Sequence, residues 1–237
     1  MSAPDDPPVL LLTRPAEASR RFAAALGAGL PAGVRVIVSP LLEIEAVGGH
    51  ITPEQSVILT SQNAVARLAS GAGLSAWCVG PRTAAAAERA GLEVRAVAPT
   101  AEALLAQIVA AGETGPLLHL RGDKLAFPLA ERLNQAGIET HEQVVYRQRP
   151  QPLTPEAGAV LTTTDRVVVP LFSPESARHF LAESQGASAR LEIVAISEAV
   201  ARICSDAGMK AVSIAASPDG EAMTSAVLRQ LATPMPG

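Results

Sequence analysis

The chain has 237 residues, a length that suits one large domain or two small ones, each with its own core. Hydrophobic residues make up 48% of it and charged residues only 18%, which excludes a disordered chain and favours a compact α/β fold. Four Phe, one Trp and one Tyr are the only aromatic residues, and 19 Lys and Arg stand against 23 Asp and Glu. Proteins that bind single-stranded nucleic acid need stacking rings and a basic groove, so no nucleic-acid partner is expected.

No apolar run reaches the roughly 18 residues that a membrane-spanning helix needs. The first eight residues are acidic and proline-rich, whereas a secretory signal is basic and then apolar. We therefore expect a cytoplasmic protein with no membrane partner.

Metal and disulfide signals are missing from the sequence. Cys78 and Cys204 fit no metal-ligand spacing and no disulfide framework, and their apolar neighbours predict two small core residues. The four histidines are scattered singly and form no HExxH motif, so no metal site is expected.

Short β-branched or leucine-rich runs alternate with alanine-rich stretches, the pattern of a parallel sheet covered by helices. The ten predicted strands are 9–12, 34–38, 57–60, 76–79, 93–97, 117–121, 139–146, 167–171, 191–196 and 210–214. Amphipathic helices are predicted between most of them, including 16–27, 126–136, 174–184 and 198–206. Gly91, Gly137 and Gly208 each follow a predicted helix, where a helix C-terminus favours a positive φ.

The same order of elements occurs twice along the chain. The matching segments are residues 12–15 with 120–123, Ser61 with Ser173, and residues 79–91 with 196–208. Equal spacing from strand to closing glycine favours an internal duplication of five strands over a chance likeness of two α/β segments.

The domain boundaries are expected elsewhere than at the repeat junction, because residues 112–115 form only a tight loop. Stronger linker signals are the proline-dense segment 148–155 and the segment that opens at Ser39-Pro40. We predict a continuous α/β domain and a discontinuous one, connected by two crossing linkers. The continuous domain is 42–146, the discontinuous domain is 1–40 plus 149–237, and the linkers are 40–47 and 143–152.

Polar residues follow many of the predicted strands, and in open parallel sheets ligands bind at this carboxyl end, near the helix N-termini. The candidate binding residues are Arg14, Thr60, Ser61, Gln62, Asn63, Gly80, Pro81, Thr83, Arg121, Gly122, Ser173, Pro174, Glu175 and Ser197. Each also has a plain structural interpretation, since a serine before a proline, as at Ser173, is a good helix N-cap.

Arg14 and Arg121 end equivalent strands of the two repeats. If the repeats form two facing sheets, both guanidinium groups and several helix N-termini converge on one cleft, which suits a ligand with several carboxylates. Tyr146, the single tyrosine, ends the strand that enters the second linker. It is either an aromatic plug at a domain junction or a phenol that faces the cleft and donates a proton.

Phosphate-loop, nucleophile-elbow and dinucleotide-binding motifs are missing, which favours cofactor-free chemistry or simple binding. Seven motifs occur in one order: Thr13-Arg14-Pro15, Pro40-Leu41, residues 59–65, residues 79–84, Leu120-Arg121-Gly122, Val145-Tyr146 and residues 172–176. By this ordered set the chain resembles the uroporphyrinogen-III synthase (HemD) family over nearly its whole length. The resemblance implies two HemD-like α/β domains with helix-flanked parallel sheets, a two-stranded linker and a monomer.

The resemblance also implies a reaction. Family members take hydroxymethylbilane, a linear tetrapyrrole, remove its terminal hydroxyl as water and close the macrocycle with inversion of ring D, giving uroporphyrinogen III for haem biosynthesis. They are hydro-lyases that use no cofactor and no metal. The resemblance makes Tyr146 the proton donor to the leaving hydroxyl and makes the strand-end residues contacts for the substrate carboxylates.

Two positions depart from the family pattern. The usual glycine and threonine after the ninth strand are Ser197 and Val200 here, and Val200 has no hydroxyl to offer a substrate. The alternative function is a non-catalytic two-domain binding or sensor module for a small polycarboxylate, as in hinged α/β receptors. The ordered motifs and the cytoplasmic start favour the synthase.

Overall fold

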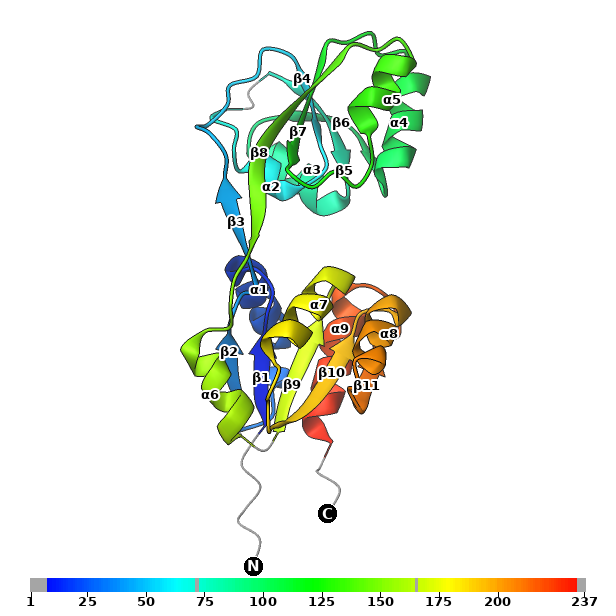
Figure 1. Cartoon of the computed structure of the whole chain (residues 1–237). Helices are drawn as coiled ribbons and strands as arrows, with labels where there is room; N and C mark the ends of the chain where they lie inside the picture. The colour runs from blue at the N-terminus through cyan, green and yellow to red at the C-terminus, as the bar shows by residue number, and fades with distance from the viewer. Residues whose placement is uncertain (1–7, 71–72, 165, 234–237) are drawn as a thin grey trace, which may run out of the picture. The chain divides into compact units, whose positions relative to one another are not determined.

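The computed structural model describes residues 8–70, 73–164 and 166–233, so most of the acidic N-terminal segment lies outside the described residues. The chain divides into two compact units. Unit 1 is built from Met1–Glu43 and Pro150–Gly237, and unit 2 is Ile44–Arg149. Each unit contains a sheet covered by helices (Figure 1). The predicted α/β class with helix-flanked parallel sheets is confirmed.

Unit 1 contains a five-stranded sheet in the order β11-β10-β9-β1-β2, with parallel pairing throughout. Its strands are β1 (Val9–Leu12), β2 (Arg35–Val38), β9 (Arg166–Leu171), β10 (Arg190–Ala195) and β11 (Ala211–Ile214). Every residue of β1 and β9 is buried, which explains their unbroken apolar runs, because helices cover both faces of a parallel sheet.

The helices of unit 1 form two layers around this sheet. They are α1 (Ala16–Leu26), the short 3₁₀ helix η1 (Gly27–Gly29), α6 (Pro155–Thr163), α7 (Pro174–Glu183), α8 (Glu198–Asp206) and α9 (Gly220–Ala232). Helices α6, α7 and α8 pack on the face that carries Leu11 and Val169. Helices α1 and α9 pack on the opposite face, which carries Leu10 and Val168. Neighbouring residues of a strand point to opposite faces, so each strand supplies both cores.

Unit 2 contains a six-stranded sheet in the order β3-β8-β7-β4-β5-β6. Its strands are β3 (Leu42–Ala46), β4 (Ser56–Leu59), β5 (Ser75–Val79), β6 (Glu93–Ala98), β7 (Leu117–Gly122) and β8 (Thr140–Pro150). Strands β4 to β8 pair in parallel. The edge strand β3 runs antiparallel to β8, since Val47 N donates to Val145 O while Gln151 N donates to Leu41 O.

The helices of unit 2 also cover both faces of their sheet. They are α2 (Gln62–Val65), α3 (Pro81–Arg89), α4 (Ala101–Ala110) and α5 (Leu129–Gln135). Helices α2 and α3 pack against Val57 and Leu120. Helices α4 and α5 pack against Ile58 and the buried ring of Trp77.

The five parallel strands of each unit follow equivalent orders, β2-β1-β9-β10-β11 in unit 1 and β8-β7-β4-β5-β6 in unit 2. This makes β1 equivalent to β7, β9 to β4, and β10 to β5, which are the pairs matched in the sequence repeat. Neither sheet is one copy of the repeat, however, because the chain crosses between the units within β3 and again within β8.

Most element boundaries agree with the prediction, but the strand predicted at 139–146 continues to Pro150 as β8, so Tyr146 lies within the strand and not at its end. The segment that forms β3 was predicted as linker and was not among the ten strands. The helix predicted at 126–136 begins at Leu129, because the residue before Pro128 is disfavoured in the α conformation. Gly91, Gly137 and Gly208 have φ angles of 85°, 84° and 87°, as predicted for helix C-termini.

Candidate functional site

The candidate residues lie at the carboxyl ends of adjacent parallel strands in each unit. In unit 2, β7 ends at Arg121-Gly122, β4 leads into residues 60–63, and β5 leads into residues 80–83. In unit 1, Arg14 follows β1, residues 173–175 follow β9, and Ser197 follows β10 (Figure 1). The fold therefore collects each set at one edge of its own sheet.

Two of the helices at these edges begin with a side-chain cap. Ser61 Oγ accepts a hydrogen bond from Asn63 N at 3.2 Å. Ser173 Oγ accepts from Ser176 N at 3.1 Å, and Ser176 Oγ accepts from Ser173 N at the same distance. The structural interpretation of these serines as N-caps is therefore correct for both, and it occupies part of their hydrogen-bonding capacity.

Helices α3 and α8 are among those that begin without a side-chain cap hydrogen bond. They follow the equivalent strands β5 and β10. Gly80, the residue before α3, has φ of 81°, which favours glycine and leaves no side chain over the helix start. The first-turn N–H groups of such a helix, together with its dipole, attract an anion. The first turn of α3 contains no acidic residue, whereas that of α8 contains Glu198.

The third residue of α3 and the third residue of α8 both point into the protein. Thr83 of α3 is 6% exposed, and Val200 of α8 is fully buried among the apolar side chains of unit 1. These positions are equivalent in the repeat. Of these two equivalent positions, the one in unit 2 therefore carries a hydroxyl and the one in unit 1 carries an apolar side chain.

The remaining candidates of these two edges differ in exposure. Gln62, Asn63 and Glu175 are half-buried, while Pro81 and Pro174 are exposed. Both prolines occupy the first position of their helix, where the missing N–H costs no hydrogen bond. Their contribution to a binding edge is therefore the rigid start of the helix.

Arg14 and Arg121 have different surroundings. The Arg14 guanidinium lies 4.2 Å from the centre of the Phe172 ring, and Phe172 in turn meets Phe22 edge to face at 5.1 Å. Arg121 Nη2 donates to Glu142 Oε2 at 3.1 Å and Nη1 donates to Gly122 O at 2.9 Å. Stacking on the ring stabilises the Arg14 cation. The Arg121 guanidinium is held by a carboxylate and a carbonyl of unit 2.

Tyr146 belongs to the core of unit 2, with 8% of its surface exposed. Its ring covers Gly122 of the neighbouring strand, where an added Cβ would lie 2.7 Å from Tyr146 Cζ and 3.0 Å from Oη. The ring is thus a packed core side chain of unit 2. It also fixes the phenolic oxygen at the end of β7, next to the candidate residue Gly122.

Sequence reasoning missed two residues beside the candidate site, His119 and Glu142. The His119 side chain is 3% exposed, its Nδ1 lies 3.2 Å from Glu142 Oε1, and its Nε2 lies 3.4 Å from Thr60 Oγ1. Burial lowers the pKa of His119, and this outweighs the opposite effect of the nearby Glu142. His119 and Glu142 are 23 residues apart in the sequence and meet only because β7 and β8 pair in this register. The sequence alone therefore shows His119 as an isolated histidine.

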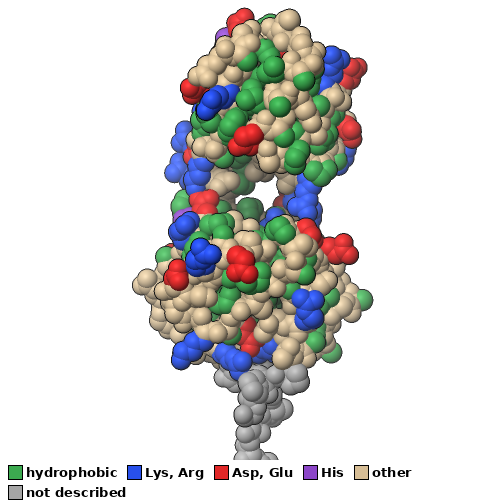
Figure 2. Space-filling model, turned by 90° about the vertical axis from the view of Figure 1, so that its right-hand side faces the viewer, with side chains coloured by type: hydrophobic (Ala, Val, Ile, Leu, Met, Phe, Trp, Pro, Cys, Tyr) green, Lys and Arg blue, Asp and Glu red, His purple; other side chains and the backbone are tan. Residues whose placement is uncertain are grey.

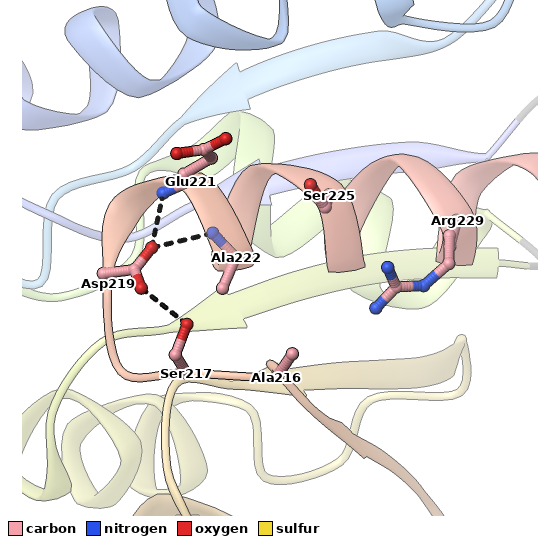
Figure 3. Close-up of a pocket in the computed structure, with 7 residues that line it drawn as sticks. All are labelled: Ala216, Ser217, Asp219, Glu221, Ala222, Ser225 and Arg229. Atoms are coloured by element: carbon pink, nitrogen blue, oxygen red, sulfur yellow. Dashed lines mark hydrogen bonds between the residues drawn. The ribbon is translucent and has the colours of Figure 1, made fainter.

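A surface pocket lies at the start of α9 in unit 1 (Figure 3). It is lined by Ala216, Ser217, Asp219, Glu221, Ala222, Ser225 and Arg229. Asp219 Oδ1 accepts from the N–H groups of Glu221 and Ala222, both at 2.9 Å, so the helix start is already capped by a carboxylate. This pocket contains none of the candidate residues and does not suit an anionic ligand.

The displayed surface and the described side chains add no charged patch and no metal-ligand cluster to the candidate site. Figure 2 shows acidic and basic side chains interspersed over the face that it displays, with no single-sign field. Within residues 8–70, 73–164 and 166–233, no group of three or more His, Cys, Asp and Glu side chains is arranged to hold a metal ion. Among those same residues, no helix has the length and apolarity needed to cross a membrane.

Comparison with known proteins gives one family. The family model described as uroporphyrinogen-III synthase HemD matches residues 23–225. A crystal structure of uroporphyrinogen-III synthetase from Helicobacter pylori has 18% identity and a TM-score of 0.64, with 94% of this chain and 99% of that chain covered. A mutant uroporphyrinogen III synthase from Thermus thermophilus has 16% identity, the same coverage and a TM-score of 0.48. No match was found among curated protein sequences.

Proposed function

Because the chain belongs to the uroporphyrinogen-III synthase HemD family, we propose that its strand-end residues bind hydroxymethylbilane and direct its closure to uroporphyrinogen III. The family consists of cofactor-independent lyases of tetrapyrrole synthesis that act on this substrate. The reaction removes the terminal hydroxyl of the linear tetrapyrrole as water and closes the macrocycle with inversion of ring D.

The uncapped start of α3 is the observation that supports substrate binding most strongly. Its first turn combines free N–H groups, a glycine at the N-cap and the Arg82 side chain, with no acidic residue. A substrate carboxylate placed there meets both the helix dipole and a guanidinium group. The uncapped start of α8 and the ring-supported guanidinium of Arg14 extend the same chemistry to unit 1. Helix N-termini and individual arginines thus attract the substrate carboxylates, although the chain as a whole carries a net negative charge.

Tyr146 is the proposed proton donor to the leaving hydroxyl. When the C–O bond of the hydroxymethyl group breaks, the oxygen leaves as water if it takes the phenolic proton, and a cationic tetrapyrrole remains for ring closure. A positioned acid is effective only when its geometry is fixed. The packing of the Tyr146 ring on Gly122 supports such a fixed geometry. The enzyme's further task is to hold the substrate in the conformation from which the inverting attack is the nearest one.

We also propose that the protein acts as a monomer in the cytoplasm, as the resemblance to the family implies. Light scattering coupled to size-exclusion chromatography measures the mass in solution. A mass of one chain supports the monomer, and a concentration-independent dimer contradicts it.

The proposed function is tested by identifying the product isomer. Hydroxymethylbilane is generated enzymatically in the presence of the protein, and the products are oxidised and separated into isomers I and III. The account predicts mostly isomer III, whereas a control without protein gives isomer I through spontaneous closure. If only isomer I forms while the protein still binds the tetrapyrrole, the chain is the non-catalytic binding module instead.

A further inference from the structure

A hydrogen-bonded chain of four side chains runs beneath the carboxyl edge of the unit 2 sheet. Arg121 Nη2 donates to Glu142 Oε2 at 3.1 Å, and His119 Nδ1 lies 3.2 Å from Glu142 Oε1. His119 Nε2 lies 3.4 Å from Thr60 Oγ1, which is the longest of the three contacts. Thr60 is the half-buried end of this chain, at the point where β4 leads into α2. The other end is closed, since Arg121 also donates to the carbonyl of Gly122.

The order of partners along this chain fixes where the protons are. A carboxylate only accepts hydrogen bonds, so the Glu142 carboxylate requires a hydrogen on His119 Nδ1. The imidazole is buried and neutral, because burial lowers the pKa of His119. A neutral imidazole with its hydrogen on Nδ1 has a bare lone pair on Nε2. The Thr60 hydroxyl therefore donates its only hydrogen inward, to His119.

Once its hydrogen is committed to His119, Thr60 presents only lone pairs to the edge of the sheet. An oxygen in this state accepts a hydrogen bond but repels a carboxylate. The next residue behaves differently, since Ser61 Oγ accepts from Asn63 N and its own hydrogen remains to be donated. Neighbouring hydroxyl groups of opposite polarity fit a ligand that carries an N–H donor close to a carboxylate.

We infer that Thr60 accepts a hydrogen bond from a pyrrole N–H of the substrate and that His119 is the positioning residue that gives Thr60 this polarity. The inference rests on the proposed function, because a tetrapyrrole carries both N–H groups and carboxylates. It also revises one expectation from the sequence, which treated Thr60 as a carboxylate contact like its neighbours. Glu142 acts through His119 and sets its tautomer.

Three variants test the inference through substrate binding. Thr60→Val removes the accepting oxygen at constant shape and is expected to raise KM about tenfold with little change in kcat, the effect of losing one hydrogen bond to bound substrate. Thr60→Ser keeps the hydroxyl, and its KM is expected to stay within about twofold of the wild-type KM. Glu142→Gln is expected to raise KM as Thr60→Val does, although residue 142 contacts no substrate.

The Glu142→Gln effect follows from the contact with Arg121. Arg121 Nη2 needs an acceptor, so the amide oxygen of the new side chain faces Arg121 and its NH₂ group faces His119. Nδ1 then becomes the acceptor, the hydrogen moves to Nε2, and the Thr60 hydroxyl turns outward. Nitrogen-15 NMR of the histidine side chains measures directly which ring nitrogen of His119 carries the hydrogen. We expect the Nδ1–H tautomer of His119 in the wild type and the Nε2–H tautomer in the variant.

The matched control is Glu139→Gln, which changes the exposed pair of Glu139 with His141 at the edge of the same unit. It is expected to leave KM and kcat unchanged. An Nε2–H tautomer in the wild type, or Thr60→Val and Glu142→Gln variants with KM within about twofold of the wild type, overturns the inference. These outcomes are distinct from a failure of the proposed function, in which the wild-type protein itself forms no isomer III.

Discussion

Gly122 and Tyr146 are partners on adjacent strands β7 and β8, and the tyrosine ring occupies the space in which a side chain at residue 122 would lie. An added Cβ at Gly122 would meet Tyr146 Cε2 and Cζ at 2.7 Å. Nonbonded contacts of a Cβ atom are essentially never this short in proteins, so the observed ring position requires glycine at residue 122. The position of the proposed acid therefore depends on Gly122 as well as on Tyr146 itself.

The first prediction concerns this contact. Gly122→Ala forces the Tyr146 ring to move, because the ring is packed in the core and has no free space to absorb the methyl group. We expect kcat to fall about tenfold or more and stability to fall by about 1–3 kcal/mol, the usual cost of overpacking. Steady-state kinetics and urea unfolding measure the two effects.

Gly158→Ala is the control for the first prediction. Gly158 lies in helix α6 of unit 1, and an added Cβ there meets no atom within 4 Å. Alanine in a helix interior is favoured over glycine by roughly 0.5–1 kcal/mol, so this variant should keep its activity and be slightly more stable. Equal activity of Gly122→Ala and Gly158→Ala would show that the ring position is unimportant for turnover.

The fold was largely predictable from the sequence because the buried strands carry continuous apolar runs. Strands β1 and β9 are buried along their whole length, and their predicted boundaries are correct to within one residue. Strand β3 was less visible, because Leu42 and Ile44 alternate with glutamates and the segment is preceded by a proline. An exposed edge strand has few apolar residues to identify it.

A second prediction concerns the pH dependence of unit 2. Burial lowers the pKa of His119 in the folded protein below its ordinary value of about 6.5. Between these two values the unfolded chain binds more protons than the folded one, so stability falls as the pH falls below about 6.5. Urea unfolding at pH 7.5 and 5.5, followed by the fluorescence of the buried Trp77 in the same unit, measures this loss.

His119→Gln should weaken that pH dependence, while His141→Gln should leave it unchanged. The imidazole of His141 is 59% exposed, so this variant removes a histidine from the surface of the same unit rather than from its core. An undiminished loss of stability in His119→Gln would assign the acid sensitivity of unit 2 to other groups.

A third prediction concerns a buried ion pair at the opposite end of the unit 1 sheet. Arg166 Nη2 and Nε contact Glu192 Oε2 at 2.8 and 3.0 Å, and both side chains are less than a tenth exposed. Arg166 Nη1 also donates to the carbonyl of Thr233 just after α9. Arg166→Met leaves Glu192 without its main partner and should destabilise unit 1 by about 3–5 kcal/mol. Urea unfolding followed by circular dichroism tests this value.

Arg21→Met provides the matched control, since Arg21 pairs with Glu17 on the exposed face of α1. Exposed pairs of this kind contribute little, and a change below about 0.5 kcal/mol is expected. Losses of similar size in the two variants would mean that burial adds nothing to the Arg166 contact.

A fourth prediction concerns the two thiols. Cys78 and Cys204 are fully buried, and burial together with the charge of Glu88 raises the pKa of Cys78 to about 11. A thiol without thiolate character and without solvent access reacts slowly. A thiol reagent should modify neither cysteine in the native protein at pH 8 and both after unfolding. Rapid native labelling of either one would contradict this packing.

The candidate site was less predictable than the fold. The strand-end positions of Ser61, Ser173 and Gly80 follow from the order of elements, but the uses of their side chains do not. Ser61 and Ser173 use their hydroxyl groups to cap α2 and α7. That α3 and α8 have no side-chain cap is visible only in the structure. His119 and Glu142 meet through the register of two strands, which local sequence patterns do not specify.

The most direct test of the account is the rate at which Tyr146→Phe forms isomer III from enzymatically supplied hydroxymethylbilane, compared with the wild type. Phenylalanine keeps the ring that packs on Gly122 and removes only the phenolic hydroxyl. We expect turnover to fall several-fold while product binding is largely kept and isomer III remains the enzymatic product. Wild-type turnover in Tyr146→Phe would contradict the assignment of Tyr146 as the proton donor.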